Sequence, residues 1–377
     1  MLIQGGNRIS SRMILLRITG VLIITVLVLI SQAFAAAINE KLSIGGVMAG
    51  VYQYQDVDDS AGTDNDGDGV FVFRPEISYT PTEKDEIFAK FGFASGNGLN
   101  EISPFVFAPW AADMEDDVKD INGRNRDHLL VAYYKHTIDF GKDNTLGLTG
   151  GIIDSEDYLD NNAFTNDEYT KFMNEALDNG FDALLPSYDI GGVVEWGIGS
   201  FGITGVIMDV GEDEDNYNFF ALGAKYTVDT SLGIGNYRVF IAGTSNDFLD
   251  PTGLEKEGHS GVSFSFDQQF GKIIGGWIRF GTKDDKAEID YESIYSGGIN
   301  ISGSPWGRDD DNAGIGYGYY DGGNSGLDNT RVAEIYTRFV LNEYFSFTLD
   351  LQYMKDEYLN RNEVKGFIGG LRLVAEF

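Results

Sequence analysis

The sequence predicts an all-β protein, a transmembrane antiparallel β-barrel of about 16 strands with long outer loops and short periplasmic turns. Three observations lead there. From residue 41 onward apolar and polar residues alternate, short and long connections take turns along the chain, and no stretch beyond the N-terminal region is apolar enough for a helical span. Because hydrocarbon satisfies no backbone N–H or C=O, strands cross it only as a closed cylinder without edges.

The N-terminal region has the features of a secretory signal peptide. Three arginines precede an apolar run at 18–30, and small residues around Ala35 fit a cleavage site. The alternative is a retained membrane helix, but the run is shorter than the roughly 20 residues that a span requires. We therefore expect a signal peptide at 1–35 and a single barrel domain at 36–377.

The alternation is clearest in FSFTLDLQY (345–353), where aromatic and aliphatic residues occupy the odd positions and Ser, Thr, Asp and Gln the even ones. The last strand repeats the pattern and ends on Phe377, which resembles the assembly signal of bacterial outer-membrane barrels. Strands are expected at 41–56, 69–80, 87–95, 127–140, 144–153, 188–198, 201–211, 216–228, 235–246, 259–268, 272–284, 292–302, 313–320, 331–341, 344–355 and 364–377.

The connections between these segments favour a membrane barrel over a soluble fold. Tight turns such as PTEKD, GKDN, GS, QFG and NE alternate with acidic loops at 57–68, 96–126, 154–187 and 247–258. A transmembrane barrel places short turns at its periplasmic end and long loops outside. A secreted sandwich or solenoid is the alternative, but no fixed repeat period is present.

The composition excludes several classes of function. The chain has 377 residues, no cysteine and a formal net charge of -32, with no Lys/Arg cluster among its acidic runs. The missing cysteines exclude a disulfide scaffold and a zinc-thiolate site. Nucleic acid is not expected as a partner, because a strongly acidic chain repels a phosphate backbone.

One motif has metal-ligating residue types. In DNDGDG (64–69), Asp64, Asp66 and Asp68 match the first half of a calcium loop, but Pro75 stands where the closing glutamate belongs. A solvated outer loop is the plainer interpretation, and loose Ca²⁺ or Mg²⁺ binding is the alternative. No other cofactor is expected.

An enzyme is not expected. The three histidines have no metal-pair spacing, and the pair weighed as base and nucleophile is His259 and Ser260. Adjacent residues of a strand point to opposite faces, so this pair cannot form a catalytic dyad. An outer-membrane hydrolase remains the less favoured alternative.

The stretch GWIRFG (276–281) shows two faces that meet different media. Ile278 and Phe280 are expected to face lipid, and Trp277 and Arg279 a water-filled lumen. Charged residues near the bilayer midplane are costly on the lipid side. The same alternation therefore places the following inward, either as solvated wall residues or as solute contacts: Arg74, Glu76, Lys90, Glu195, Arg279, Glu334, Arg338, Asp350, Arg372 and Glu376.

Longer blocks of the sequence resemble a known family. They are GIIDSEDYLDNNAFTNDEYTKFMNEAL (151–177), GGWIRFG (275–281), YSGGINISGSPWGRDDDNAGIGYGY (295–319) and EIYTRFVLNEYFSFTLDLQYMKD (334–356). In this order they resemble the carbohydrate-selective porins of the OprB type. The resemblance implies a sixteen-stranded barrel in the outer membrane of a Gram-negative bacterium, narrowed by inward-folded loops and passing glucose-like sugars by passive diffusion.

The resemblance also implies a site. The expected substrate pathway is Arg74, Glu76, Lys90, Trp277, Arg279, Glu334, Arg338 and Asp350. The expected constriction residues, from the loop 154–187, are Asp160, Asn162, Phe164, Asn166, Phe172 and Asn174. An ordinary external loop is the alternative for that segment, and a general or cation-preferring porin the alternative for the function. Expected partners are outer-membrane lipid and lipopolysaccharide, small sugars and the barrel assembly machinery; the sequence predicts no oligomeric state.

Overall fold

The computed structural model describes residues 36–58, 64–179, 184–212 and 216–377. The predicted signal peptide at 1–35 lies outside the described residues. No helix in the described part of the chain combines the length and apolar character needed to cross a bilayer.

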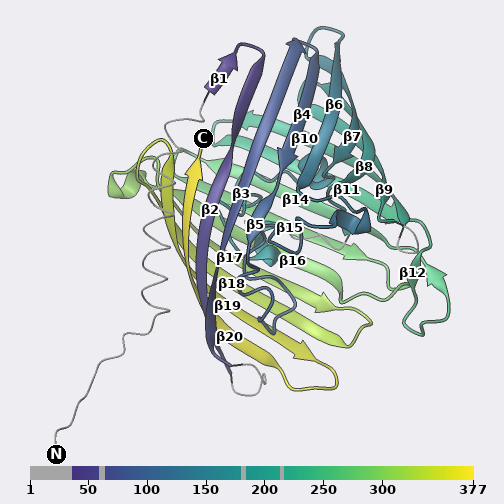
Figure 1. Cartoon of the computed structure of the whole chain (residues 1–377), viewed down its shortest axis with the longest axis vertical. Coiled ribbons are helices and arrows are strands. Elements are labelled where there is room, and N and C mark those ends of the chain that lie inside the picture. Colours follow the sequence, from purple (N-terminus) through teal and green to yellow (C-terminus); the bar gives the residue numbers. More distant parts are fainter. Residues whose placement is uncertain (1–35, 59–63, 180–183, 213–215) are drawn as a thin grey trace, which may run out of the picture.

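The described residues form one closed antiparallel barrel (Figure 1). The wall strands are β2 (Leu42–Val57), β3 (Asp66–Thr82), β4 (Asp85–Phe91) with β5 (Phe93–Ser95), β6 (Leu129–Asp139), β7 (Asn144–Ile153), β8 (Asp189–Ile198), β9 (Phe201–Val210), β10 (Tyr217–Thr230), β11 (Gly233–Thr244), β14 (Ser260–Phe270), β15 (Ile274–Lys283), β16 (Tyr291–Ser302), β17 (Asn312–Gly322), β18 (Leu327–Val340), β19 (Phe345–Tyr358) and β20 (Val364–Glu376). Because β4 and β5 follow each other along the same neighbour, β3, they make one wall strand, and the predicted number of sixteen is confirmed.

The barrel closes where its first and last wall strands meet. β2 pairs with β20 from Val47 opposite Glu376 to Val57 opposite Gly366, so the sheet has no free edge there. The backbone of the terminal Phe377 exchanges two hydrogen bonds with Gly46, at 3.0 and 3.1 Å, and its ring stacks on Phe73. The C-terminal aromatic residue therefore helps to close the cylinder.

Short and long connections gather at opposite ends of the barrel. In Figure 1 the tight turns between β3 and β4 and between β6 and β7 lie at the top, and the loop between β11 and β14, which contains β12, lies at the lower right. Three short strands were not expected from the sequence. They are β1 (Ala36–Asn39), beside the start of β2, and β12 (Phe248–Leu249) and β13 (Lys256–Glu257), which form a small hairpin inside the loop predicted at 247–258.

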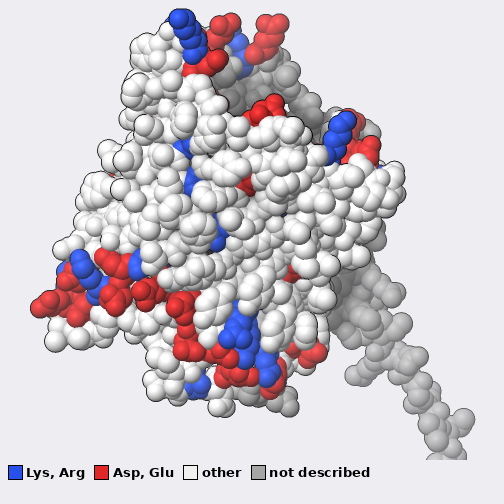
Figure 2. Space-filling model, turned by 180° about the vertical axis from the view of Figure 1, so that it is seen from behind, with Lys and Arg blue, Asp and Glu red and all other residues white. Residues whose placement is uncertain are grey.

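The two faces of the wall differ as the alternation predicts. In β15, Ile278 is 50% exposed on the outer face, whereas Trp277 and Arg279 are 2% and 1% exposed on the inner face. Outward aliphatic and aromatic residues make a broad band with few charges between charged groups at the two ends (Figure 2). This band is the surface that faces hydrocarbon.

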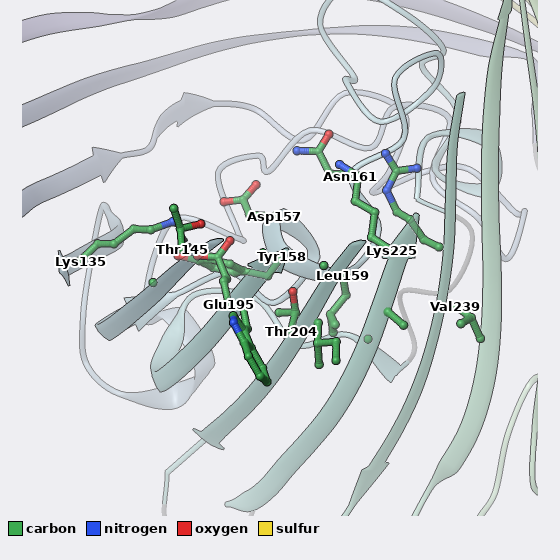
Figure 3. Close-up of a pocket in the computed structure, with 18 of the residues that line it drawn as sticks. Lys135, Thr145, Asp157, Tyr158, Leu159, Asn161, Glu195, Thr204, Lys225 and Val239 are labelled. Atoms are coloured by element: carbon green, nitrogen blue, oxygen red, sulfur yellow. Dashed lines mark hydrogen bonds and ion pairs between the residues drawn. The ribbon is translucent and has the colours of Figure 1, made fainter. Parts of the chain in front are cut away.

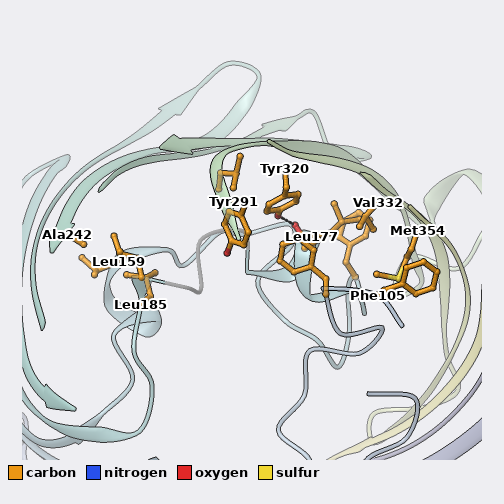
Figure 4. Packing of buried hydrophobic residues seen from close by; sticks show 14 of the residues in the cluster. Phe105, Leu159, Leu177, Leu185, Ala242, Tyr291, Tyr320, Val332 and Met354 are labelled. Atoms are coloured by element: carbon orange, nitrogen blue, oxygen red, sulfur yellow. Dashed lines mark hydrogen bonds between the residues drawn. The ribbon is translucent and has the colours of Figure 1, made fainter. Parts of the chain in front are cut away.

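The interior is filled by protein on one side. Two segments turn inward: residues 96–128, between β5 and β6, and the described residues 154–179 and 184–188, between β7 and β8. The first contains η2 (Ile121–Gly123), and the second contains α2 (Glu156–Leu159) and α3 (Glu175–Asp178). Leu177 of α3 points toward Tyr320 of the wall within one continuous apolar cluster (Figure 4). We call the described residues 154–179 and 184–188 the inner loop and residues 96–128 the second loop.

The lipid-facing assignment of β15 can be tested by placing a charge on it. Ile278→Lys should lower the stability of the membrane-inserted barrel by about 2–4 kcal/mol, since Ile278 lies mid-strand on the outer face. The measurement is the urea midpoint of refolding into liposomes, read by heat-modifiable migration. Thr282→Lys, on the same face near the strand end, is the control and should cost about 0–1 kcal/mol. Equal costs at both positions would contradict the assignment.

Candidate functional site

A buried ion pair fixes the inner loop to the wall. Asp160 follows α2, and its carboxylate lies 2.8 Å from Nε of Arg279 on β15, with both side chains at most 1% exposed. The Nη1 of Arg279 also donates to the backbone oxygen of Leu177 at 2.9 Å. One arginine of the wall therefore holds two turns of the inner loop.

Backbone amides of the inner loop are bonded to a second wall carboxylate. Glu334 on β18 accepts hydrogen bonds from the N–H groups of Met173 and Asn174, at 2.6 and 3.0 Å. The Asn174 side chain caps α3 by accepting from the N–H of Ala176 at 3.0 Å. Its amide donates to Gln352 of β19 at 2.8 Å.

Aromatic packing and glycines complete this contact. Phe172 packs edge-on against Trp277 and Tyr336, with ring centroids 5.6 and 5.0 Å away. A Cβ placed on Gly316 of β17 would come within 2.9 Å of the Phe172 ring. The glycines of the GIGYG stretch thus leave room for the inner loop.

The second loop lies over the inner loop and is bonded to it. The N–H of Ala111 donates to the oxygen of Met173 at 2.9 Å, and Nε1 of Trp110 donates to the oxygen of Glu168 at 2.9 Å. Arg74 of β3 is 6% exposed and forms ion pairs with Asp113 of the second loop and Glu168 of the inner loop. Wall and both loops are therefore joined at one guanidinium group.

The opposite wall, from β6 to β11, keeps an open chamber of about 370 Å³. Its wall residues include Lys135, Glu195 and Lys225, and Asp157 and Tyr158 of the inner loop also line it (Figure 3). Lys135 pairs with Glu195 at 2.6 Å. The chamber is thus lined by side chains of both charge signs and by the aromatic residues Tyr158 and Trp196.

Three further cavities form a series with this chamber, each sharing lining residues with the next. The outer mouth, about 340 Å³, is formed mainly by the second loop; the narrow cavity, about 160 Å³, lies between both loops and β3 and β4; the inner mouth, about 800 Å³, lies at the β3–β4 turn. The shared residues, from the outer mouth inward, are Asp113, Ser187 and Tyr188, then Asp157, then Lys135 and Thr137.

The residues predicted for the pathway divide into two groups. Arg74 and Lys90 line the narrow cavity. Trp277, Arg279, Glu334 and Asp350 face inward but are buried, at 2%, 1%, 2% and 7% exposure. None of the four lines the open chamber, and Trp277, Arg279 and Glu334 contact the inner loop directly. Glu76 is partly exposed on β3 opposite Lys90, and Arg338 pairs with Glu376 at 2.8 Å near the turn end of β18.

The residues predicted for the constriction all lie inside the barrel. Asn166 lines the narrow cavity and donates to Glu156 and Asn179. The others bind the wall: Asp160 pairs with Arg279, Asn162 donates to Ser265 at 3.2 Å, Phe164 covers Gly275, Phe172 packs on Trp277, and Asn174 bonds Gln352. The inner loop therefore narrows the barrel, and its exposed border is made by residues that sequence reasoning missed.

The chamber-lining residues that sequence reasoning did not name differ in whether a sequence pattern marks them. Lys225 and Arg238 line the chamber from β10 and β11, and alternation within their strands could have found them. Asp157, Tyr158 and Asn161 lie in the inner loop. No periodic pattern marks residues of an irregular segment, so those three carried no signal.

No group of three or more His, Cys, Asp or Glu in the described ranges is arranged to hold a metal ion. Asp66 and Asp68 lie in β3, where each carboxylate accepts from the N–H of the next glycine, at 2.7 Å. Asp64 precedes the strand, and its backbone oxygen accepts from Gln55 at 3.3 Å. The calcium hypothesis thus gains no support from these three residues.

Closed barrel, inward-folded loop and adjoining polar cavities together define a porin-type membrane channel. Residues 196–377 match the family model described as carbohydrate-selective porin, OprB family, which confirms the resemblance over that segment.

Two solved structures share the fold, and one further protein is similar in sequence. The high-pH structure of Pseudomonas putida OprB aligns with a TM-score of 0.70 at 14% identity, covering 89% of this chain and 94% of that one. The outer membrane channel DcaP of Acinetobacter baumannii aligns with a TM-score of 0.55 at 12% identity, covering 91% and 99%. An uncharacterized protein of Aquifex aeolicus is 28% identical over 309 residues, covering 81% of this chain and 86% of its own.

The buried pair between Asp160 and Arg279 provides a test of how the inner loop is held. Asp160→Leu leaves an unpaired buried guanidinium, which should destabilise the loop by about 3–5 kcal/mol. We expect faster limited proteolysis within 154–188 and a larger, noisier single-channel conductance. The double variant Asp160→Leu/Arg279→Met removes both charges and should return to near wild-type behaviour. If the single variant behaves like the wild type, the ion pair does not hold the loop.

Proposed function

We propose that this protein is a passive diffusion channel in the outer membrane of a Gram-negative bacterium and that its solutes are small carbohydrates. The observation that carries the proposal is the series of four adjoining polar cavities from the loop end to the turn end of a closed barrel. The description of the family matched by residues 196–377 and the outer-membrane channels of similar fold support it.

The lining of the chamber suits neutral hydroxylated solutes. Lys135, Lys225 and Arg238 supply donors, Glu195 supplies an acceptor, and the Tyr158 ring offers an apolar face to the C–H side of a sugar. These groups can replace water at the hydroxyls one after another. Weak binding at several stations permits passage, whereas one tight site would stop it.

A general or cation-preferring channel is the second candidate, favoured by one observation. The outer mouth is lined by Asp113, Asp116, Asp117 and Asp120, with Lys119 as its only lysine or arginine. Such a mouth raises the local concentration of cations. The chamber beyond this mouth is lined by both positive and negative side chains. The two candidate functions therefore differ in the solute that crosses the chamber.

A hydrolase has little geometric support at the pair weighed from the sequence. The hydroxyl of Ser260 donates to Asp284 at 2.8 Å, and Nδ1 of His259 has no hydrogen-bond partner. Outer-membrane lipid, lipopolysaccharide and the barrel assembly machinery are proposed partners on the same basis as the proposed location.

Reconstitution distinguishes the candidates. Liposomes carrying the mature protein should swell in isotonic glucose faster than protein-free liposomes, and more slowly in a disaccharide, because the narrow cavity is the smallest of the four. Glucose should also reduce the ion current across planar bilayers. If glucose neither enters nor reduces the current while reversal potentials show cation selectivity, the sugar assignment fails and the second candidate stands. Turnover of ester or peptide substrates by the same preparation would argue for a hydrolase.

A further inference from the structure

Three basic residues stand apart from the other lysines and arginines of the barrel wall. Among the described wall strands, only Arg331 of β18, Lys355 of β19 and Lys365 of β20 carry a cation on the outward face, since their buried neighbours along each strand face inward. The remaining wall lysines and arginines face inward, where most are buried or line the cavities. Outward positive charge on the wall is therefore confined to one place.

The three residues form a single row across three neighbouring strands. Arg331 lies directly opposite Lys355, and Lys355 lies directly opposite Lys365. Each lies within four residues of the loop end of its strand. Like charges placed opposite one another destabilise a sheet, so this arrangement requires anionic partners. We call Arg331, Lys355 and Lys365 the basic row.

The basic row lies at the border of the apolar band. On its turn side, the next outward positions are Ala333, Tyr353 and Phe367, which are again opposite one another. The rings of Tyr353 and Phe367 lie 5.1 Å apart, and Phe367 is exposed to the outside. Two residues of a strand span roughly 7 Å, and outward aromatic residues mark the interfaces of a membrane barrel. The basic row is therefore at the depth of lipid headgroups.

Carboxylates pair with the basic row from its loop side. Glu357 lies 3.2 Å from Arg331 and 2.6 Å from Lys355. Glu363, in the loop between β19 and β20, lies 2.8 Å from Lys355 and 2.6 Å from Lys365. The positive charges thus stand between these carboxylates and the apolar residues. An anion that approaches from the membrane side meets the positive charges first.

A phosphate group is the anion that fits this row. A lysine has three N–H donors and an arginine five, whereas the ion pairs above engage two on Lys355 and one on Arg331. Phosphate has several acceptor oxygens, so it can bridge the further donors of neighbouring side chains. Partly exposed ion pairs contribute little stability, so the carboxylates can give way. Because apolar residues adjoin the row, the phosphate is that of a lipid whose chains lie against Tyr353 and Phe367.

We propose that the basic row binds the phosphate of an outer-leaflet glycolipid, with Arg331, Lys355 and Lys365 donating to the phosphate oxygens and an acyl chain packing on Tyr353 and Phe367. This inference rests on the proposed location in the outer membrane, which puts the loop end of the barrel in the outer leaflet. It adds a lipid site on the outside of the wall, separate from the solute passage.

The test is the affinity of the folded protein for bis-phosphorylated lipid A, measured by native mass spectrometry in detergent with EDTA. The wild type should bind this lipid, and should bind the dephosphorylated form at least tenfold more weakly. The variant Arg331→Gln/Lys355→Gln/Lys365→Gln should lose roughly tenfold or more, the size of one lost hydrogen bond to a charged group. Glu363→Gln frees donors of both lysines and should tighten binding, which a merely structural role of the row would not produce.

The control is Lys84→Gln/Lys142→Gln/Lys272→Gln, which removes three exposed lysines from turns at the opposite end of the barrel. It should bind lipid A as the wild type does, and heat-modifiable migration checks that every variant is folded. Equal affinity of the row variant and the wild type overturns the site. Full displacement of the lipid by millimolar inorganic phosphate overturns it in favour of free phosphate, and loss of binding in EDTA overturns it in favour of a bridging cation.

Glucose entry into liposomes separates this site from the channel. The row variant should admit glucose at the wild-type rate, because the basic row lies outside the barrel. If the wild type admits glucose but the lipid affinities overturn the site, the proposed function stands. If the wild type admits no glucose, the proposed function fails, and the lipid affinities still decide the site.

Discussion

The arrangement of this channel depends on buried charged groups of the wall that bond the inner loop. Arg279 and Glu334 face the barrel axis, where a charge without partners would be costly once the loop covers it. Asp160 and the amides of Met173 and Asn174 supply those partners. The inner loop therefore supplies the ion-pair and hydrogen-bond partners of the buried wall charges, and these charges supply the partners of the loop. Neither the buried charges nor the folded loop would be favourable without the other.

This contact divides the interior into two halves. Strands β15 to β20 with β2 and β3 are covered from inside. Strands β6 to β11 border the open chamber, although part of β8 to β11, including Val206 and Phe219, also packs in the apolar cluster with the inner loop. The second loop reinforces the division, because Arg124 pairs with both Asp189 and Asp209 at the far side of the barrel, at 2.6 Å each. The solute passage is consequently displaced toward one wall, and the loop residues nearest that wall, Asp157 and Tyr158, become its border.

The fold was predictable because the wall obeys a local rule. Successive side chains of each strand point alternately to the lipid and to the barrel interior. The outward direction of Ile278 and the number of strands could therefore be inferred from the local sequence pattern alone. The covering of one half was not predictable in this way. Arg279 and Lys225 are both charged and both face inward, but only the three-dimensional course of the inner loop decides that Arg279 is buried and that Lys225 borders the chamber. The resemblance indicated which loop folds inward; its direction depends on contacts far apart in the sequence, such as Asp160 with Arg279.

The division into a covered and an open half can be measured directly, because the chain has no cysteine of its own. Single cysteines at Thr204 of β9 and Thr348 of β19 occupy matched inward positions, one lining the chamber and one fully buried beneath the loops. A charged thiol reagent added to reconstituted channels should react at position 204 and change the current, while position 348 stays unreactive. Reaction at 348 with none at 204 would contradict this arrangement and place the passage along the other wall.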